Sequence, residues 1–491
     1  MPTSNSTAPS PSPGQTHARG AEMTTLTAHP PRRAFAAHRR MGHGFDAVTG
    51  LTVYLVLLLF IPSNLAISSL GSLGRPALLW GLVLALWWTV HHLQAPPSVV
   101  RRPWQPVRLA LAALAVVVLV SYAAAILRGQ PADQISPATT SLLRILSWAG
   151  VLLVAVDGVR TLRDLGVVVR RLVYAVAIVA LLGLVQTFTG QSWIDLVTLP
   201  GFSVTEEGGV QTRGGLTRAS GTATHPLEYA MMLTMGLPLA LTAATCAARD
   251  GRRAVPMWLC GALIAVAAVL SASRSALLGL IVAMVCVFPG LTRQVRGYLI
   301  LGAPLVAGGA IMLRPGIVGT MLAMFTGVGT DPSALSRASG LERAPGFIAV
   351  SPVYGSGFGT FLPRYYIFDN QWVITTVELG VLGLIAFAGL VCAGVWSAWS
   401  ARRLAPKEPR LRVYGQGLAA AIVTAAVVMA GFDGVSFPIS AGMLFLVLGL
   451  CGAARAVAAT QAQMQPVRDS IVRGPRERPF APESVRREEP V

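Results

Sequence analysis

Charged residues are scarce in this sequence. Asp, Glu, Lys and Arg together make up 12% of its 491 residues, whereas 53% are hydrophobic. A soluble globular chain carries about 25% charged residues. A soluble core has no room for so much apolar surface, but a bilayer does, because each spanning helix needs roughly 20 mostly apolar residues. The composition therefore excludes an ordinary soluble protein and predicts an integral membrane protein.

Lysine is nearly absent, and acidic residues are few. Lys407 is the sole lysine, so arginine supplies 38 of the 39 basic residues, and the 21 Asp and Glu leave a net charge of +18. In a soluble chain such a charge would suggest nucleic acid. Here most arginines lie in short segments between apolar runs, where topology and contact with membrane lipids explain them, so we expect no nucleic-acid partner. The preference for arginine is typical of a GC-rich bacterial genome.

Cysteine is also rare and shows no paired spacing. The absence of a Cys-x-x-Cys motif argues against a disulfide framework and against a zinc site. We expect no metal and no cofactor, and we expect the cysteines to pack as small hydrophobic side chains. All five fall within or at the edge of apolar runs: Cys246, Cys260, Cys286, Cys392 and Cys451.

Long apolar runs fill the middle of the chain. They do not alternate as the strands of a β-barrel would, and a backbone in lipid must satisfy its own hydrogen bonds, so the runs predict helices. The predicted fold is an all-α, polytopic membrane domain over residues 46–456 with about 12 transmembrane helices. The runs lie near residues 48–68, 76–93, 107–127, 140–156, 167–188, 227–247, 255–272, 275–290, 297–314, 372–398, 414–432 and 436–456.

Polar tails flank this domain. Residues 1–45 are rich in Ser, Pro, Thr and Arg, and residues 457–491 are rich in Pro and Arg, so both are predicted to be disordered. With both tails in the cytoplasm, 29 of the 39 basic residues lie inside and 10 outside, as the positive-inside rule requires. We therefore expect a multi-pass protein of the bacterial cytoplasmic (inner) membrane with both termini cytoplasmic.

Two of the predicted outer segments are long. One spans about 189–226, and the other spans about 315–371, between the ninth and tenth helices. Loops of this length are usually functional or disordered, and the aromatic residues and glycines of the second favour function. Ten outer basic residues break the topological rule: Arg75, Arg128, Arg144, Arg213, Arg218, Arg274, Arg314, Arg337, Arg343 and Arg364.

Arg274 is the clearest of these exceptions. It lies in the short segment Ser271–Ser275, whose sequence is Ser-Ala-Ser-Arg-Ser, between two apolar runs. A charge at a membrane edge is costly unless it is paired or functional. Arg274 either reaches the lipid headgroups or binds an anion beside hydroxyls such as that of Ser273, because the planar guanidinium suits phosphate.

The segment from Arg218 to Pro226 precedes the sixth run and holds His225, the sole histidine on the predicted outer side. A lone histidine is more often structural than catalytic, and for His225 contact with a ligand is favoured over catalysis. Asp369 lies at the entrance to the tenth run. It serves either as a base with a raised pKa at a low-dielectric boundary or as a helix N-cap.

The second outer segment also contains alternating glycines, in Gly355-Ser356-Gly357-Phe358-Gly359. Their spacing does not fit a dinucleotide fingerprint. Glycine permits close approach of a backbone to a ligand, but a tight turn explains this pattern equally well.

Together these segments resemble the O-antigen ligase and polymerase family of bacterial surface polysaccharide assembly. The resemblance covers roughly residues 170–450. It rests on the order of short motifs: Arg218 to Pro226, Ser271 to Ser275, Arg343, Pro352 to Gly359, Asp369-Asn370 and Glu378-Leu379-Gly380. It implies a metal-independent membrane glycosyltransferase that transfers or polymerises a glycan linked to undecaprenyl pyrophosphate. The acceptor is a glycan or another hydroxyl compound on the outer side, with polysaccharide export or assembly proteins as candidate partners.

The resemblance also implies roles for particular residues. Arg218, Arg274 and Arg343 would bind the pyrophosphate, and Asp369 would be the catalytic base in the place of the family's histidine. This departure favours a polymerase or another branch of the family over a lipid A–core ligase. Residues that would contact the substrate are His225, Ser273, Gly357, Asn370 and Glu378.

Two other functions stay open on the sequence alone. A transporter of an anion or of a lipid-linked glycan could use the same arginines, although the apolar runs hold almost no acidic residues at mid-depth for ion coupling. A non-catalytic subunit of polysaccharide assembly would explain why an aspartate replaces the family's histidine.

Overall fold

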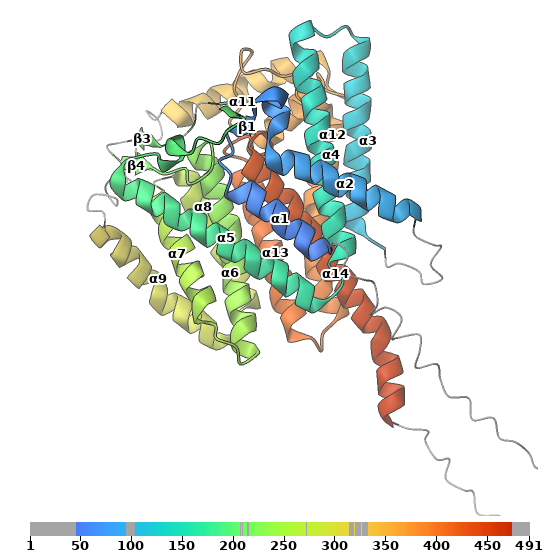
Figure 1. The fold of residues 1–491 in the computed structure, drawn as a ribbon, viewed down its shortest axis with the longest axis vertical. Helices are drawn as coiled ribbons and strands as arrows, with labels where there is room; N and C mark the ends of the chain where they lie inside the picture. Colours follow the sequence, from blue (N-terminus) through green and yellow to red (C-terminus); the bar gives the residue numbers. More distant parts are fainter. Residues whose placement is uncertain are drawn as a thin grey trace, which may run out of the picture. The chain divides into compact units, whose positions relative to one another are not determined.

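Helices dominate the computed structural model: of the residues that it describes, 78% are helical and 3% are in strands (Figure 1). The structure describes residues 46–94, 104–206, 208, 210–213, 216–271, 273–313, 319, 326 and 332–473. The predicted tail over residues 1–45 lies outside these described residues. The chain is an all-α, polytopic membrane protein, as its apolar runs predict.

Eight described helices are long and apolar enough to cross a bilayer. They are α2 (Pro76–Gln94), α3 (Pro106–Leu127), α4 (Ala132–Gly158), α5 (Leu162–Thr189), α6 (Pro226–Arg249), α12 (Gln371–Leu404), α13 (Pro409–Val428) and α14 (Pro438–Arg473). Because α14 continues to Arg473, it includes the first part of the predicted C-terminal tail; residues 474–491 lie outside the described part.

Shorter helices occupy the remaining apolar runs, so the predicted count of twelve crossings is not confirmed. At about 1.5 Å per residue, helices of 13 to 16 residues fall short of a hydrocarbon core of about 30 Å. These helices are α1 (Ala47–Leu59), α7 (Val255–Leu270) and α8 (Arg274–Val287), the last extended by η4 (Phe288–Gly290). A further helix, α9 (Arg293–Leu313), fills the ninth run.

The helices form a buried centre and an apolar periphery. The apolar windows of α6 and α14 are 94% and 89% buried within the protein, whereas those of α2 and α3 are only 28% buried. Exposed side chains of α3 include Leu109, Val116 and Leu119. A soluble protein rarely exposes such a surface, and on a spanning helix it faces lipid.

The first long segment predicted to lie outside folds into short elements between α5 and α6. Strand β2 (Phe202–Val204) pairs antiparallel with β1 (Leu65–Ile67), with Leu65 opposite Val204. Strand β3 (Gln211–Arg213) pairs with β4 (Leu216–Arg218), with Gln211 opposite Arg218. Two 3₁₀ helices complete this region: η2 (Ser68–Gly74) and η3 (Trp193–Leu196).

The second long segment predicted to lie outside contains a helix that the sequence did not predict. This helix, α11 (Pro332–Val350), packs against the start of α12. A small apolar core joins them, built on Ala344, Phe368 and Val377. Over Pro332–Val350, the chain therefore forms a packed helix where the sequence predicted only a loop.

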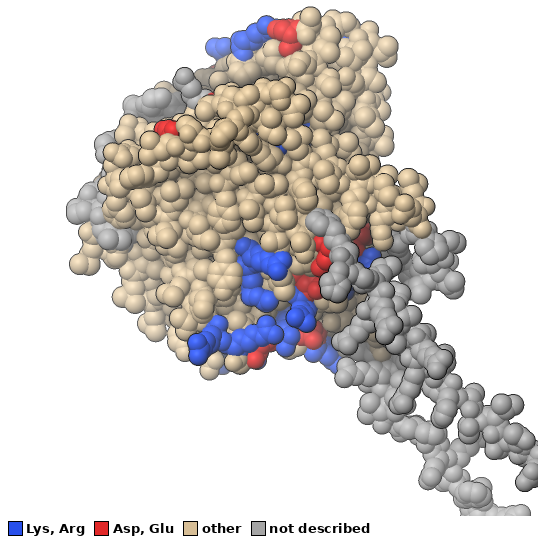
Figure 2. All heavy atoms as spheres, viewed as in Figure 1, with Lys and Arg blue, Asp and Glu red and all other residues tan. Residues whose placement is uncertain are grey.

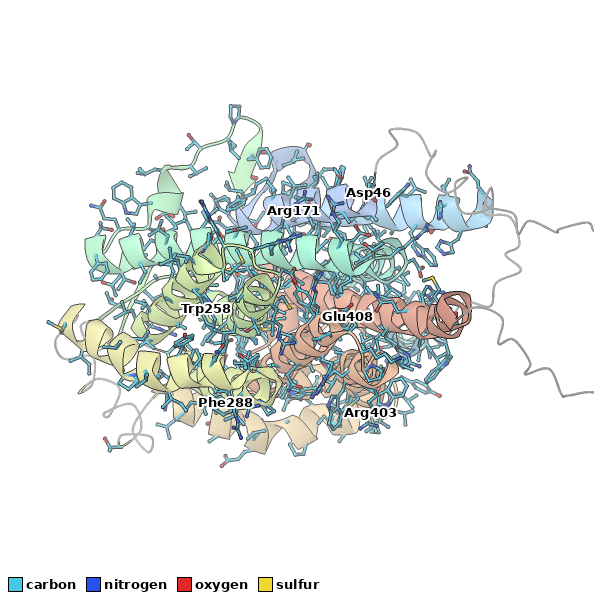
Figure 3. The ribbon with its side chains drawn as sticks, turned by 90° about the horizontal axis from the view of Figure 1, so that it is seen from below. Asp46, Arg171, Trp258, Phe288, Arg403 and Glu408 are labelled. Carbon is cyan, nitrogen blue, oxygen red and sulfur yellow. The ribbon has the colours of Figure 1, made fainter. Side chains whose placement is uncertain are left out.

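Basic side chains are concentrated toward one end of the described helices. Figure 2 shows a large group of Lys and Arg on the lower part of the visible face, below a broad band with little charge, and a smaller group beside acidic side chains at the upper edge. Figure 3 views this end and labels Arg171 on α5, Arg403 on α12 and Glu408 just before α13. In Figure 1, α11 and β1 lie toward the opposite end.

Candidate functional site

Three helices begin at one cavity of about 180 Å³. They are α6, α8 and α12, and the cavity is completed by β4 and α11. It brings together five residues singled out in the sequence, which come from three separate segments. The lining consists of Gln211, Arg218, His225, Leu227, Ser273, Arg274, Ser275, Arg337 and Asp369.

The electrostatics of this cavity suit an anion. The three guanidinium groups of Arg218, Arg274 and Arg337 and the single carboxylate of Asp369 give a formal sum of +2. The first N–H groups of a helix lack partners within the helix, and the helix dipole places partial positive charge there. A helix N-terminus therefore favours an anion, and three helices start beside this cavity. First N–H groups of α6 and α12 bond to the caps His225 and Asn370, so these two helices contribute through their dipoles.

Strand pairing positions Arg218. The register places Gln211 opposite it, and the Arg218 Nη1 donates to Gln211 Oε1 at 3.5 Å. After the strand, the buried side chain of Gln186 on α5 holds the chain: its Oε1 accepts from Gly221 N at 2.8 Å and its Nε2 donates to Gly221 O at 2.9 Å. Arg218 is only 7% exposed, so its guanidinium lies at the edge of the protein core.

His225 is the N-cap of α6. Its Nδ1 accepts the backbone N–H of Leu227 at 3.1 Å, so the neutral ring carries its proton on Nε2. Burial, together with the positive charge of Arg218, lowers the pKa of His225 to about 4. Near neutral pH the ring is therefore an uncharged hydrogen-bond donor rather than a proton acceptor.

A buried carboxylate that the sequence analysis missed fixes the segment before α6. Glu228 is fully buried; its Oε2 accepts from Thr224 N at 3.0 Å and its Oε1 accepts from Ile439 N at 2.6 Å. This side chain thereby ties the segment that carries His225 to the start of α14. Its position in the first turn of α6, two residues after Pro226, was the available signal.

The α7–α8 connection presents Ser273 and Arg274 together. The Ser271 hydroxyl donates to Ala268 O at 2.7 Å and so completes the end of α7. Ser273 occupies the N-cap position of α8, but its side chain makes no capping hydrogen bond. Its hydroxyl instead lines the cavity beside Arg274.

At the start of α12, one polar residue caps the helix and its neighbour lines the cavity. Asn370 is the N-cap, and its Oδ1 accepts from Trp372 N at 3.0 Å and from Val373 N at 3.3 Å. The capping role considered for Asp369 thus belongs to Asn370, and Asp369 lines the cavity. Partial burial raises the pKa of Asp369, and the positive charge of Arg337 opposes that rise.

Two arginines of α11 lie on different sides of the helix. Arg337 lines the cavity, whereas Arg343 is exposed, with its guanidinium 5.5 Å from the centre of the Tyr366 ring. Six residues at about 100° each turn the helix by about 240°. The structure therefore does not bring Arg343 into the cavity; Arg337 takes the place predicted for it.

Residues 259–388 match the family model for O-antigen ligase. This match confirms the resemblance to the O-antigen ligase family predicted from the motifs. It spans Arg274, Arg337 and Asp369, whereas the segment from Arg218 to Pro226 lies outside the matched residues. No curated protein matches the chain. With the membrane-spanning helices, the O-antigen ligase match supports a membrane enzyme of polysaccharide assembly.

Two other motifs of the O-antigen ligase segment bind each other instead of lining this cavity. The glycine run meets a break in α12 at Gly380: Ser356 N donates to Val377 O at 3.0 Å, and Gly357 N donates to Glu378 O at 2.9 Å. Bonds from the loop thereby satisfy carbonyl groups that the broken helix leaves open. This explains Gly357 as a structural residue at the helix break.

Glu378, at the same break, lines a second and larger cavity of about 350 Å³. Its carboxylate accepts the backbone N–H groups of Gly359 and Phe361. Of the residues expected to contact the substrate, His225 and Ser273 therefore line the first cavity. Asn370 caps α12 beside it, and Gly357 and Glu378 lie at the helix break.

Other arginines on the predicted outer side have structural partners. Arg75 forms an ion pair with Glu206 at 2.7 Å. Arg128 donates to Gly355 O at 2.7 Å, and Arg364 pairs with Asp133. The side chains of Arg213 and Arg314 lie outside the described part of the chain. An arginine that breaks the positive-inside rule can therefore lie at the cavity or form a structural contact elsewhere.

Proposed function

We propose that this protein is a membrane glycosyltransferase that transfers or polymerises a glycan carried on undecaprenyl pyrophosphate, on the outer side of the bacterial cytoplasmic membrane. The observation that carries the proposal is the convergence of three arginines, three helix N-termini and one carboxylate on a single cavity. A pyrophosphate ester fits this charge, and the carboxylate supplies a base beside it.

The reaction follows from these groups. An acceptor hydroxyl attacks the anomeric carbon of the lipid-linked sugar and forms the new glycosidic bond. The bond between that carbon and the pyrophosphate oxygen breaks, and its electron pair leaves with the lipid pyrophosphate. Asp369 accepts the proton of the attacking hydroxyl, a role in which a positioned base contributes about 10²–10⁴-fold.

The cationic groups act on the leaving group. Arg218, Arg274 and Arg337 stabilise the negative charge that develops on the departing pyrophosphate. His225 adds a neutral N–H donor from Nε2, and the Ser273 hydroxyl adds another. These groups are held before the reaction begins, because strand pairing, helix starts and buried side chains fix them.

Transfer from the lipid-linked glycan of the native strain tests this proposal, using the full chain purified in nanodiscs. We expect Arg274→Ala and Asp369→Asn each to lower the rate of transfer by roughly 10²-fold or more. Both variants should retain the abundance and thermal stability of the wild type. Unchanged transfer in both variants would overturn the assigned roles.

The same assay separates the competing functions. A transporter would move the lipid-linked glycan or an anion across reconstituted vesicles without forming a new glycosidic bond. A non-catalytic subunit would show no transfer alone, and Asp369→Asn would leave polysaccharide length in cells unchanged. For the proposed enzyme, that variant shortens or abolishes the polymer.

A further inference from the structure

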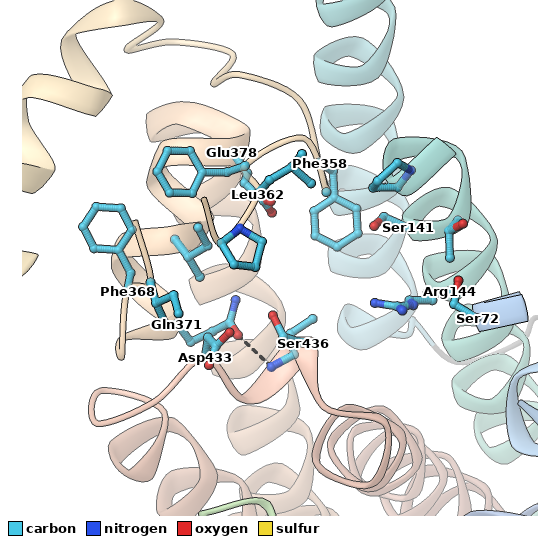
Figure 4. Close-up of a pocket in the computed structure, with 18 of the residues that line it drawn as sticks. Ser72, Ser141, Arg144, Phe358, Leu362, Phe368, Gln371, Glu378, Asp433 and Ser436 are labelled. Atoms are coloured by element: carbon cyan, nitrogen blue, oxygen red, sulfur yellow. Dashed lines mark hydrogen bonds between the residues drawn. The ribbon is translucent and has the colours of Figure 1, made fainter. Parts of the chain in front are cut away.

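The second cavity, drawn in Figure 4, differs from the first in both size and lining. It measures about 350 Å³ and lies between α4, the segment before α12, the start of α12, and η5 (Gly434–Ser436). Figure 4 shows Arg144 and Ser141 of α4 facing Gln371 and Asp433 across it. Nothing in the proposed transfer chemistry uses this cavity.

Its charge differs from that of the first cavity. The carboxyl groups of Glu378 and Asp433 lie with the single guanidinium of Arg144, whereas three guanidinium groups and one carboxylate line the first cavity. The second cavity therefore has no excess of positive charge to bind a phosphate group, whereas a neutral polyol would find hydrogen-bond acceptors and donors. The two cavities are therefore suited to chemically different parts of a substrate.

Aromatic rings form one wall of this second cavity. Phe361, Tyr366 and Phe368 all line it, with Phe361 and Phe368 centred 5.5 Å apart and Tyr366 and Phe368 4.9 Å apart. Their mutual packing fixes the wall. A few oriented polar groups beside flat apolar rings are typical of a small-molecule site, and a pyranose presents both hydroxyls and an apolar C–H face.

One segment of the chain contributes to both cavities and is held in place by hydrogen bonds. Phe368 lines the second cavity and Asp369, the next residue, lines the first. Gln371 braces this segment, since its Oε1 accepts from Val435 N at 2.7 Å and its Nε2 donates to Thr375 Oγ1 at 2.9 Å. Burial raises the pKa of Asp433 to about 6, and the negative charge of Asp369 adds to that rise. The carboxylates of the two cavities therefore interact electrostatically.

We infer that the second cavity binds a sugar unit of the acceptor glycan and holds it beside Asp369. This inference rests on the proposed glycosyltransferase function, because it names the site of the second substrate. The aromatic wall packs against the face of the sugar, and Asp433 accepts hydrogen bonds from its hydroxyls. The pyrophosphate of the donor stays in the cationic cavity.

Binding of two separate probes tests the inference on the full chain in nanodiscs. The first probe is the glycan released from the strain's lipid-linked intermediate by mild acid, which carries no pyrophosphate. The second is inorganic pyrophosphate. We expect Phe361→Ala and Asp433→Asn each to weaken glycan binding at least about fivefold and to leave pyrophosphate binding within about twofold. Arg274→Ala should do the reverse.

A matched control separates contact with the sugar from loss of packing. Phe347 belongs to the same aromatic group, 5.1 Å from Phe361, but does not line the cavity. Phe347→Ala should keep glycan binding within about twofold of the wild type. Equal weakening by Phe347→Ala and Phe361→Ala, or absence of glycan binding by the wild type, would overturn the inference.

The two proposals can fail separately. Glycan binding that depends on Phe361 and Asp433, in a protein that transfers no glycan, would retain the sugar site and refute the enzyme. Transfer that proceeds normally, with glycan binding unaffected by either variant, would retain the enzyme and refute this site.

Discussion

At the scale of single residues, the start of α12 shows how neighbouring polar side chains acquire different tasks. Asn370 caps the helix, which leaves the Asp369 carboxylate at the cavity. The sequence alone could not assign these tasks, because both residue types are good N-caps. Only the backbone geometry decides which of the two oxygens reaches the first N–H groups.

The raised pKa of Asp369 predicts a particular pH dependence. A base acts only when deprotonated, so transfer should fall as the pH drops through the raised pKa of this carboxyl, above the ordinary value of about 3.9. The pH profile of kcat/KM measures this. Its acidic limb should disappear in the residual activity of Asp369→Asn; a limb that stays unchanged in this variant would assign the titration to another group.

His225 should act without a change of charge. Because burial and Arg218 lower its pKa to about 4, the ring is neutral throughout the working range. Glutamine can replace its N–H donor, so we expect His225→Gln to keep transfer within about tenfold and His225→Ala to lose more. Comparing kcat/KM for the two variants from pH 5.5 to 8 tests this, and a histidine that serves as base would make them equally inactive.

Arginine placement on α11 shows a second limit of the sequence. Arg337 and Arg343 both stand out as basic residues on the predicted outer side, but helix phase decides which one meets the cavity. That phase was hidden because α11 is polar, contains Pro345, and forms by packing on α12.

At the scale of elements, apolar runs predicted the helices and many of their ends, but they missed a few ends by several residues. Each run contains a helix, since a backbone in lipid must satisfy its hydrogen bonds locally. The first run ends early, because the chain after Leu59 turns and forms β1 with a partner in the 189–226 segment. Such long-range pairing leaves no periodic signal in the sequence.

The break in α12 should depend on glycine at Gly380. Its φ is +68°, and a Cβ atom there would clash with the backbone carbonyl oxygen of Val353. We expect Gly380→Ala to cost roughly 1–3 kcal/mol, lowering the midpoint of thermal unfolding in detergent. Gly389 lies on the same helix with open space around its Cβ position, so Gly389→Ala is the matched control. An equal drop in the unfolding midpoint of both variants would contradict a specific need for glycine at the helix break.

At the scale of the whole described domain, the shared direction of three helices places the residues of the first cavity at one end. The helices α6, α8 and α12 all begin at the same end, as the alternation of crossings predicted from the basic residues requires. The sequence could not show that the N-termini of these three helices lie beside the same cavity. Which helices become neighbours depends on how side chains pack around the buried α6 and α14.

The orientation of this end is a prediction that labelling can check. In a cysteine-free background, Arg343→Cys should react with a membrane-impermeant maleimide in intact spheroplasts, because we place α11 outside. Lys407→Cys should react only after permeabilisation. Position 343 is exposed, and position 407 lies between α12 and α13. The reverse pattern would place the cavity in the cytoplasm and exclude the proposed lipid-linked donor side.

The central claim is that the cationic cavity binds the pyrophosphate while its glycan is transferred. Single-turnover release of undecaprenyl pyrophosphate from the lipid-linked glycan tests it most directly, with Arg337→Ala compared against Arg343→Ala on the same helix. We predict a loss of roughly 10²-fold or more for Arg337→Ala and a rate within about twofold of the wild type for Arg343→Ala, whose exposed side chain lies outside the cavity. Equal rates for the two variants, or a larger loss for Arg343→Ala, would contradict the account.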